Sequence, residues 1–186
     1  MTGLLVSRKD YERVLSLIGV LSEKLMARGM MLGTAESCTG GLISALCTEV
    51  AGSSRWFAGG VVSYSNSVKT GLLGVRADLL EAHGAVSGEV VGAMAGGALQ
   101  VLGADISLSV SGIAGPGGGS ADKPVGTVWI GTALRGNGGD GPAASGGAGY
   151  GCVITTRPHH FPGGRGEVRF AAALAALEAV GNLLAT

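Results

Sequence analysis

Short apolar runs alternate along this chain with longer segments of helical periodicity. From Lys9 to Arg28, apolar side chains recur every three or four residues, which predicts an amphipathic helix packed on a sheet. Elsewhere, apolar runs of strand length alternate with segments that carry helix-start and helix-end signals. We expect strands at 30–35, 57–64, 105–110, 125–134 and 151–156, and further helices at 39–50, 67–73, 76–83, 87–102 and 165–184.

Strands interleaved with helices are typical of an α/β fold, here a three-layer helix–sheet–helix sandwich. The late strands follow one another without long intervening helices, which favours a mixed sheet over a fully parallel one. A length of 186 residues with 46% apolar content suits a single domain covering residues 1–186. Glycine makes up about half of residues 136–151, which predicts a flexible surface loop joining two strands of a hairpin, with a substrate lid as the alternative.

Polar loops follow three of the predicted strands. The first loop, from Thr34 to Gly41, reads Thr-Ala-Glu-Ser-Cys-Thr-Gly-Gly. The second runs from Ser63 to Lys69, and the third, from Val110 to Gly119, is too rich in glycine for regular structure. Because open α/β sheets bind ligands at the carboxyl ends of their strands, we expect the three loops to line one cleft.

The first loop carries side chains of the nucleophile type between a strand and a helix. Its glycines allow a sharp turn and close approach of a ligand. We expect Thr39 to cap the following helix, whose free N–H groups would attract a phosphate or a developing oxyanion. The alternative is a plain strand-to-helix turn with a capping hydroxyl.

Composition argues against a nucleic-acid partner and against a secreted protein. Lysine and arginine together equal aspartate and glutamate, giving a formal net charge of +0. We interpret the basic residues near the C-terminus as a solvated loop and helix face; they are Arg157, His159, His160, Arg165 and Arg169. No signal peptide or membrane-spanning apolar window occurs, so we expect a cytoplasmic protein without a membrane partner.

No motif supports a cofactor or a metal. Cys38, Cys47 and Cys152 form no C-x-x-C pair, which argues against a zinc site and a disulfide framework. No Walker A element is present, and the one G-x-G-x-x-G pattern, at 136–141, opens no predicted helix. We therefore expect neither cofactor nor metal.

Several ordered motifs resemble the CinA C-terminal domain family, whose stand-alone members are nicotinamide mononucleotide (NMN) deamidases of the PncC type. The matching stretches cover nearly the whole chain: 34–41, 51–54 with Trp56-Phe57, 63–66 with Lys69, 84–87, 109–117 and 123–129. The stretch 135–151 matches no family motif, and we expect an altered hairpin there. The resemblance implies a free-standing, cofactor-free amidohydrolase with NMN as substrate, and it is compatible with a homodimer.

The resemblance implies Ser37 as nucleophile, Lys69 as general base and Tyr64 as a hydroxyl that assists proton movement or orients the lysine. A serine is inert alone, but a buried, neutral lysine can activate it. Among the four lysines, Lys69 is the best placed, although a solvated helix lysine is the alternative. Cys38 competes as nucleophile, and we favour Ser37 because no histidine is placed to pair with a thiolate.

Two loops are predicted to bind the substrate phosphate through backbone N–H groups. The candidate substrate-binding residues are Thr39, Gly40 and Gly41 in the first loop, and Ser111, Gly112, Gly115 and Gly117 in the third. A function of a different class stays open, because CinA-like proteins are also linked by name to competence and DNA damage. In that case the chain would be a non-catalytic nucleotide-binding or interaction module.

Overall fold

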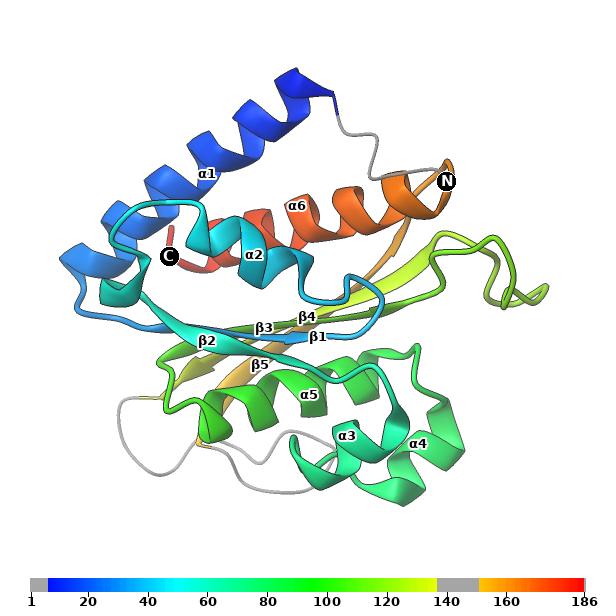
Figure 1. Cartoon of the computed structure of the whole chain (residues 1–186). Helices are drawn as coiled ribbons and strands as arrows, with labels where there is room; N and C mark the ends of the chain where they lie inside the picture. The colour runs from blue at the N-terminus through cyan, green and yellow to red at the C-terminus, as the bar shows by residue number, and fades with distance from the viewer. Residues whose placement is uncertain (1–6, 137–150, 186) are drawn as a thin grey trace.

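The computed structural model describes residues 7–136 and 151–185, which form a five-stranded sheet between two layers of helices (Figure 1). The strands are β1 (Leu32–Glu36), β2 (Phe57–Val62), β3 (Ile106–Gly112), β4 (Thr127–Arg135) and β5 (Cys152–His160). The helices are α1 (Arg8–Ala27), α2 (Leu42–Thr48), η1 (Ser53–Arg55), α3 (Asn66–Gly71), α4 (Ala77–His83), α5 (Gly88–Val101) and α6 (Arg165–Leu183).

The sheet has the strand order β2-β1-β3-β4-β5. Strand β1 runs parallel to β2 and β3, whereas β4 is antiparallel to both β3 and β5. Helices α1, α2 and α6 cover one face, and α3, α4 and α5 lie on the other (Figure 1). The predicted α/β sandwich with a mixed sheet is therefore confirmed. The connection between β3 and β4 carries no helix, so it joins antiparallel neighbours.

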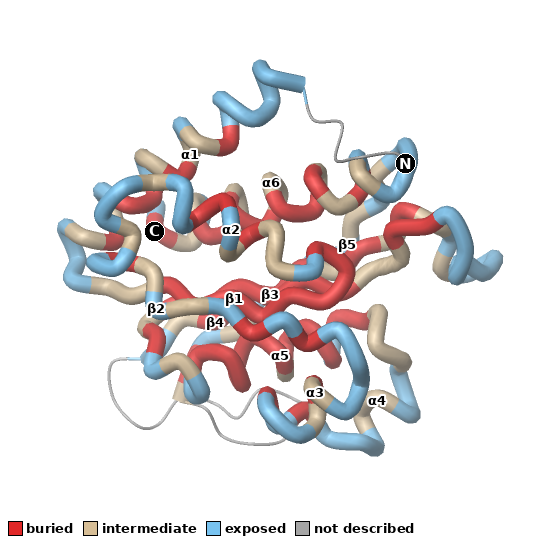
Figure 2. Tube along the Cα trace, viewed as in Figure 1, coloured by how far each residue is buried: buried red, intermediate tan, exposed pale blue. Residues whose placement is uncertain are grey.

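The predicted amphipathic helix is α1. Most of its periodic apolar residues are buried, and Ile18 and Leu25 are both 0% exposed, whereas Tyr11 is exposed. The helix packs mainly against α6 and α2 and not directly on the sheet as predicted. Buried residues elsewhere concentrate in the central strands and the sheet-facing sides of the helices (Figure 2). In α5, a Cβ at Gly97 would stand 2.0 Å from the carbonyl oxygen of Leu73. This close approach offsets the low helix propensity of glycine.

Two predicted boundaries are wrong by three residues or more. Helix α2 starts at Leu42 with Gly41 as N-cap, and no side chain of the N-cap residue or of Thr39 caps it. Strand β5 continues to His160, past the predicted end at 156, because it stays paired with β4 as far as the Thr127–His160 position. His159 and His160 therefore lie on a strand rather than in a loop, and residues 137–150 of the predicted glycine-rich loop fall outside the described residues.

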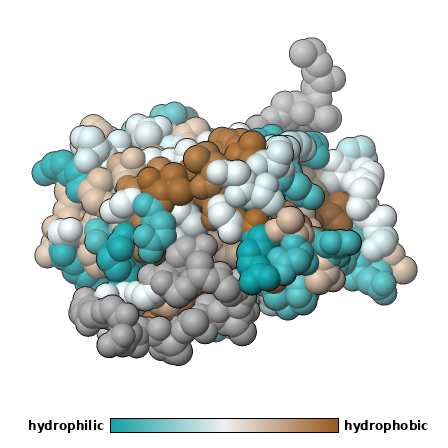
Figure 3. Space-filling view, turned by 90° about the horizontal axis from the view of Figure 1, so that it is seen from below, coloured by the Kyte–Doolittle hydropathy of each residue, from teal (hydrophilic) through white to brown (hydrophobic). Residues whose placement is uncertain are grey.

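On the surface, apolar side chains gather in a band on the face seen from the side of α3, α4 and α5 (Figure 3). The predicted homodimer stays a prediction. Among the described residues, no helix is both long and apolar enough to span a bilayer.

Candidate active site

The carboxyl ends of β1, β2 and β3 lie along the same edge of the sheet, since these strands are parallel neighbours. The loop after β1 is held against β3, because the Ser37 N–H donates to the Val110 carbonyl at 2.9 Å. It turns through Gly40 and Gly41, with φ of 61° and 90°, a region that glycine enters without strain. Ser37 thus sits at the end of a buried strand, in a turn fixed by the sheet.

Lys69 reaches from α3 to Ser37. Its side chain is 1% exposed, and its Nζ lies 3.2 Å from the Ser37 Oγ. The same Nζ donates to the carbonyl oxygens of Ser63 at 2.8 Å and Tyr64 at 3.2 Å. Burial lowers the pKa of Lys69 below its ordinary value of 10.5, because desolvation disfavours the ammonium form. The structure therefore brings the predicted nucleophile and base together, 32 residues apart in sequence.

Tyr64 contacts Lys69 through its carbonyl oxygen and not through its hydroxyl. The residue is 61% exposed, and its hydroxyl lies 3.3 Å from the Nη2 of Arg165. The predicted hydroxyl contact that would orient Lys69 is absent among the described residues. The side chain of Tyr64 is instead exposed to solvent beside Arg165.

Cys38, the competing nucleophile, is 5% exposed. Burial is the main cause that raises the pKa of its thiol to about 11, and the nearby Glu36 adds to it. A thiol with that pKa is almost wholly protonated at neutral pH and reacts slowly as a nucleophile. Cys38 is therefore a packing residue in this arrangement.

Sequence reasoning missed Glu36, the residue before Ser37. Its side chain is 0% exposed and accepts hydrogen bonds from the backbone N–H groups of Ile43 and Ser44, at 3.0 and 2.8 Å. The carboxylate thus occupies the start of α2, the place that the sequence assigned to Thr39 and to a substrate anion. An acidic residue at the end of a buried strand, shortly before a helix, was the available signal.

Arg165 and Arg169, interpreted from the sequence as part of a solvated face, join the loops of the site. Arg165 donates from Nη1 to the Gly115 carbonyl at 2.9 Å. Arg169 is half-buried and donates from Nη2 to the Thr39 carbonyl at 2.6 Å. The solvated interpretation is wrong for Arg169, which is half-buried, whereas Arg165 is exposed and also donates to the third loop. The first turns of α6 therefore connect all three loops.

The three predicted phosphate-binding residues of the first loop differ in the donors that they leave for a ligand. Gly41 is half-buried, and its N–H has no backbone acceptor among the described residues. Thr39 is 0% exposed and its Oγ1 has no described partner, while the Gly40 N–H is already used by the Ser37 carbonyl at 3.1 Å. Of these three, Gly41 is the residue with a backbone donor left for a ligand.

In the third loop, Ser111 and Gly112 belong to β3, and Ser111 is buried. Gly115 carries the carbonyl that accepts from Arg165, whereas Gly117 is exposed with nothing within 4 Å of its Cβ position. Lys123 fastens the far end of this loop, because its Nζ donates to the Val86 carbonyl at 2.8 Å. The loop is therefore anchored on both sides of its exposed tip.

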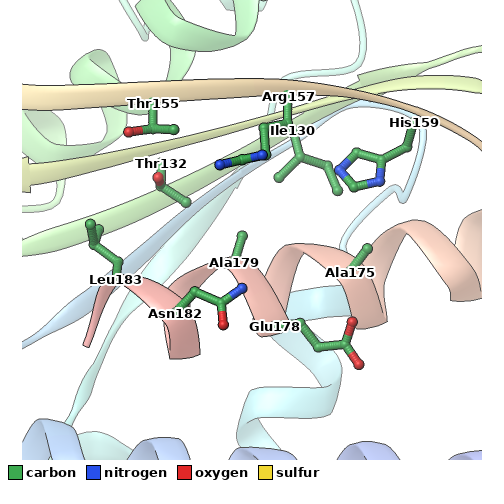
Figure 4. A pocket seen from close by; sticks show the side chains of 10 residues that line it. All are labelled: Ile130, Thr132, Thr155, Arg157, His159, Ala175, Glu178, Ala179, Asn182 and Leu183. Atoms are coloured by element: carbon green, nitrogen blue, oxygen red, sulfur yellow. The ribbon is translucent and has the colours of Figure 1, made fainter. Parts of the chain in front are cut away.

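A separate cavity of about 490 Å³ lies between α6 and strands β4 and β5 (Figure 4). Arg157 and His159 point into it from β5, and Glu178 lines it from α6, with its carboxylate bound to Arg13 of α1. Burial lowers the pKa of His159, and Arg157 adds to this shift. The predicted basic cluster is thus split between this cavity and the loop site. Within the described residues, no group of three histidines, cysteines or acidic residues could hold a metal ion.

Comparison with known proteins shows relatives of this chain with similar sequences. The nicotinamide-nucleotide amidohydrolase PncC of Enterobacter agglomerans is 49% identical over 154 residues, which cover 83% of this chain and 85% of that protein. A putative competence-damage inducible protein of Symbiobacterium thermophilum is 53% identical over 144 residues, and the chain spans only 33% of its length.

A solved structure gives the same result for the fold. The competence/damage inducible protein of Agrobacterium tumefaciens superposes with a TM-score of 0.81 at 38% identity, covering 93% of this chain and 96% of that one. Residues 15–184 match the CinA C-terminal domain. This chain therefore belongs to the CinA C-terminal domain family.

Proposed function

We propose that this protein is a nicotinamide-nucleotide amidase that hydrolyses NMN to nicotinic acid mononucleotide and ammonia, as a single domain that recycles NAD precursors in the cytoplasm. The observation that carries the proposal is the contact between Ser37 and a buried, desolvated lysine. A relative covered over most of its length is named for this activity. Buried free thiols at Cys38, Cys47 and Cys152 suit a reducing compartment.

As an ammonium, the Lys69 Nζ donates to all three oxygens around it, and the same contacts accommodate a neutral amine. Such an amine has two N–H donors and one lone pair, and two of the three oxygens around Nζ are carbonyls that can only accept. The third oxygen is the Ser37 hydroxyl, which can donate. With both N–H groups on the carbonyls, the lone pair is left for the serine proton. This is the arrangement that a general base needs.

In the first half-reaction, the Ser37 Oγ attacks the carboxamide carbon of NMN and its proton passes to the Lys69 Nζ. The tetrahedral intermediate collapses when the lysine ammonium returns this proton to the amide nitrogen, and the C–N bond breaks to release ammonia. An ester between Ser37 and the nicotinoyl carbonyl remains. The Gly41 N–H is the candidate donor to the oxyanion in this step.

In the second half-reaction, the neutral Lys69 takes a proton from water, whose oxygen attacks the ester carbonyl. The Ser37 oxygen leaves and recovers a proton from the lysine, which regenerates both groups. Nicotinic acid mononucleotide is released with its new carboxyl group. One water is consumed and one ammonia is formed, so that atoms and charge balance.

Arg165 is the candidate group for the substrate phosphate. It is exposed at the loop cluster, and its guanidinium already spans the second and third loops through Tyr64 and Gly115. A guanidinium offers a planar, paired donor set that suits phosphate oxygens.

The test is ammonia release from NMN by the purified full chain, with nicotinic acid mononucleotide identified as the co-product. Nicotinamide riboside, which lacks the phosphate, serves as the comparison substrate and should react with a much higher KM. Folded protein that binds NMN without releasing ammonia would favour the non-catalytic module suggested by the names of the competence-related relatives.

A further inference from the structure

The side chain of Glu36 accepts three hydrogen bonds. Its Oε2 accepts from the Ile43 N–H at 3.0 Å, and its Oε1 accepts from the Ser44 N–H at 2.8 Å and the Ser44 Oγ at 2.7 Å. Among the described residues it has no salt-bridge partner. Since a buried carboxyl group without hydrogen-bond partners is costly, these three hydrogen bonds compensate for the burial of Glu36.

These hydrogen bonds join the two ends of the turn that contains the proposed nucleophile. Ser37 follows Glu36 directly, and the carboxylate binds the chain again at Ile43 and Ser44, after the turn has been completed. The turn between them, 37–41, is therefore tied at both ends to one side chain. Any movement of the carboxylate would shift the peptide that carries Ser37.

The backbone of Glu36 also leads to Lys69. Its carbonyl oxygen accepts from the Ser63 N–H at 2.8 Å, and the Ser63 carbonyl accepts from the Lys69 Nζ at 2.8 Å. Glu36 is thus one hydrogen-bonded residue away from the proposed base and one peptide bond away from the proposed nucleophile.

Strand β2 leaves space for the hydrogen-bonded side chains of Glu36, Ser44 and Thr34. The Ser44 Oγ lies 2.9 Å from the Thr34 Oγ1 in addition to its contact with Glu36. A Cβ at Gly60 would stand 2.1 Å from the Ser44 Oγ and 2.4 Å from the Thr34 Oγ1. Only glycine fits at this position of β2 without displacing the hydroxyls that contact the carboxylate.

We propose that Glu36 is a positioning residue that sets the distance between Ser37 and Lys69 through the start of α2 and the Ser63 peptide. The inference rests on the proposed amidase function. Glu36 touches neither reacting group with its side chain, so its effect is on the geometry of the pair and not on proton transfer itself.

Glu36→Gln tests the role of the carboxylate with the least change in shape. A glutamine can keep its carbonyl oxygen toward Ser44, but its NH₂ group would then face the Ile43 N–H, donor against donor. We expect kcat for NMN to fall about tenfold or more while KM changes less than about threefold. A loss in kcat with little change in KM indicates that the reacting groups are misplaced while substrate binding is kept.

Ser107→Ala is the matched control. The Ser107 hydroxyl is 0% exposed and donates to the Ala95 carbonyl at 2.6 Å, near the opposite end of β3. It should lower thermal stability without the loss in kcat. A folded Glu36→Gln variant with wild-type kcat would overturn the proposal. If Glu36→Gln does not fold, Ser44→Ala, which removes one of the three contacts, should still lower kcat several-fold, and wild-type kcat there would count equally against it.

A second measurement does not depend on amidase activity. In a Ser37→Cys variant, Lys69 should favour the thiolate and speed alkylation of position 37 by iodoacetamide at pH 7, read by peptide mass. Adding Glu36→Gln should slow that alkylation about tenfold. An unchanged rate would overturn the positioning role, whereas absence of ammonia release by the wild-type protein would overturn only the proposed function.

Discussion

At the residue scale, the proposed chemistry depends on which form of Lys69 the site favours. Burial lowers its pKa from 10.5, so the neutral amine becomes available at a lower pH than for a solvated lysine. Activity should rise as pH increases through this lowered pKa and fall as the amine is protonated below it. The kcat/KM profile for NMN, measured in the free enzyme across that range, checks the direction.

Replacing Lys69 tests the same assignment by mutation. Lys69→Ala should reduce kcat by a factor of about a hundred to ten thousand, as expected for loss of a general base. Lys69→Arg keeps a positive charge but cannot give up its proton, and should be similarly inactive. An arginine variant with most of the wild-type turnover would exclude the base role. Loss of NMN binding in both variants would instead indicate a substrate anchor.

Alanine substitution of Ser37 and of the adjacent Cys38 should have opposite effects on turnover. Ser37→Ala should abolish turnover and leave NMN binding and thermal stability close to wild type. Cys38→Ala should keep substantial activity, because burial holds the thiol pKa near 11 and the thiolate is scarce. Initial rates of ammonia release for both purified variants decide between them, and the reverse pattern would transfer the nucleophile to Cys38.

At the scale of elements, α5 can pack against the segment after α3 only because Gly97 has no side chain. Gly97→Ala would bring a Cβ to 2.0 Å from the Leu73 carbonyl oxygen, so the backbone must move. We expect a loss of about 1–3 kcal/mol in the free energy of unfolding, the usual cost of overpacking. Since Leu73 follows the helix that carries Lys69, turnover should also fall.

Gly19→Ala in α1 is the control for this prediction. Nothing lies within 4 Å of a Cβ at Gly19, so alanine adds helix propensity without a clash. The substitution should raise the free energy of unfolding by about 0.5–1 kcal/mol. Urea denaturation of both variants measures the two shifts, and equal shifts of the same sign would show that close packing does not govern Gly97.

At the scale of the whole molecule, the spacing of apolar residues was enough to predict the helix layers and the mixed sheet. These features follow from the order of helices and strands along the chain, which local sequence indicates. The extent of β5 was missed, since it depends on pairing with β4 and not on its own composition. Lys69 was placed by family resemblance, and its burial is visible only in the fold. Arg169 was misinterpreted because its partner, Thr39, lies 130 residues away.

The capping of α2 illustrates the same limit. Several polar side chains near a helix start can supply its cap, and the sequence favoured Thr39 because threonine is a common capping residue. The fold instead directs Glu36 inward from the end of β1, where it takes the N–H groups of Ile43 and Ser44. Which of two candidates caps a helix is decided by the strand that precedes it.

Helix α6 contacts all three loops of the site. Replacing Arg165 tests whether these contacts serve substrate binding. Arg165→Gln removes the charge of an exposed side chain, so the free energy of unfolding should change little. We expect KM for NMN to rise about tenfold or more with kcat largely kept, because binding of the phosphate is lost in ground and transition states alike. Arg8→Gln, an exposed arginine of α1 paired with Glu12, is the control and should leave both constants unchanged. The defect should shrink for nicotinamide riboside, which has no phosphate for the guanidinium to bind, and an equal defect with both substrates would mean that Arg165 holds the loops rather than the ligand.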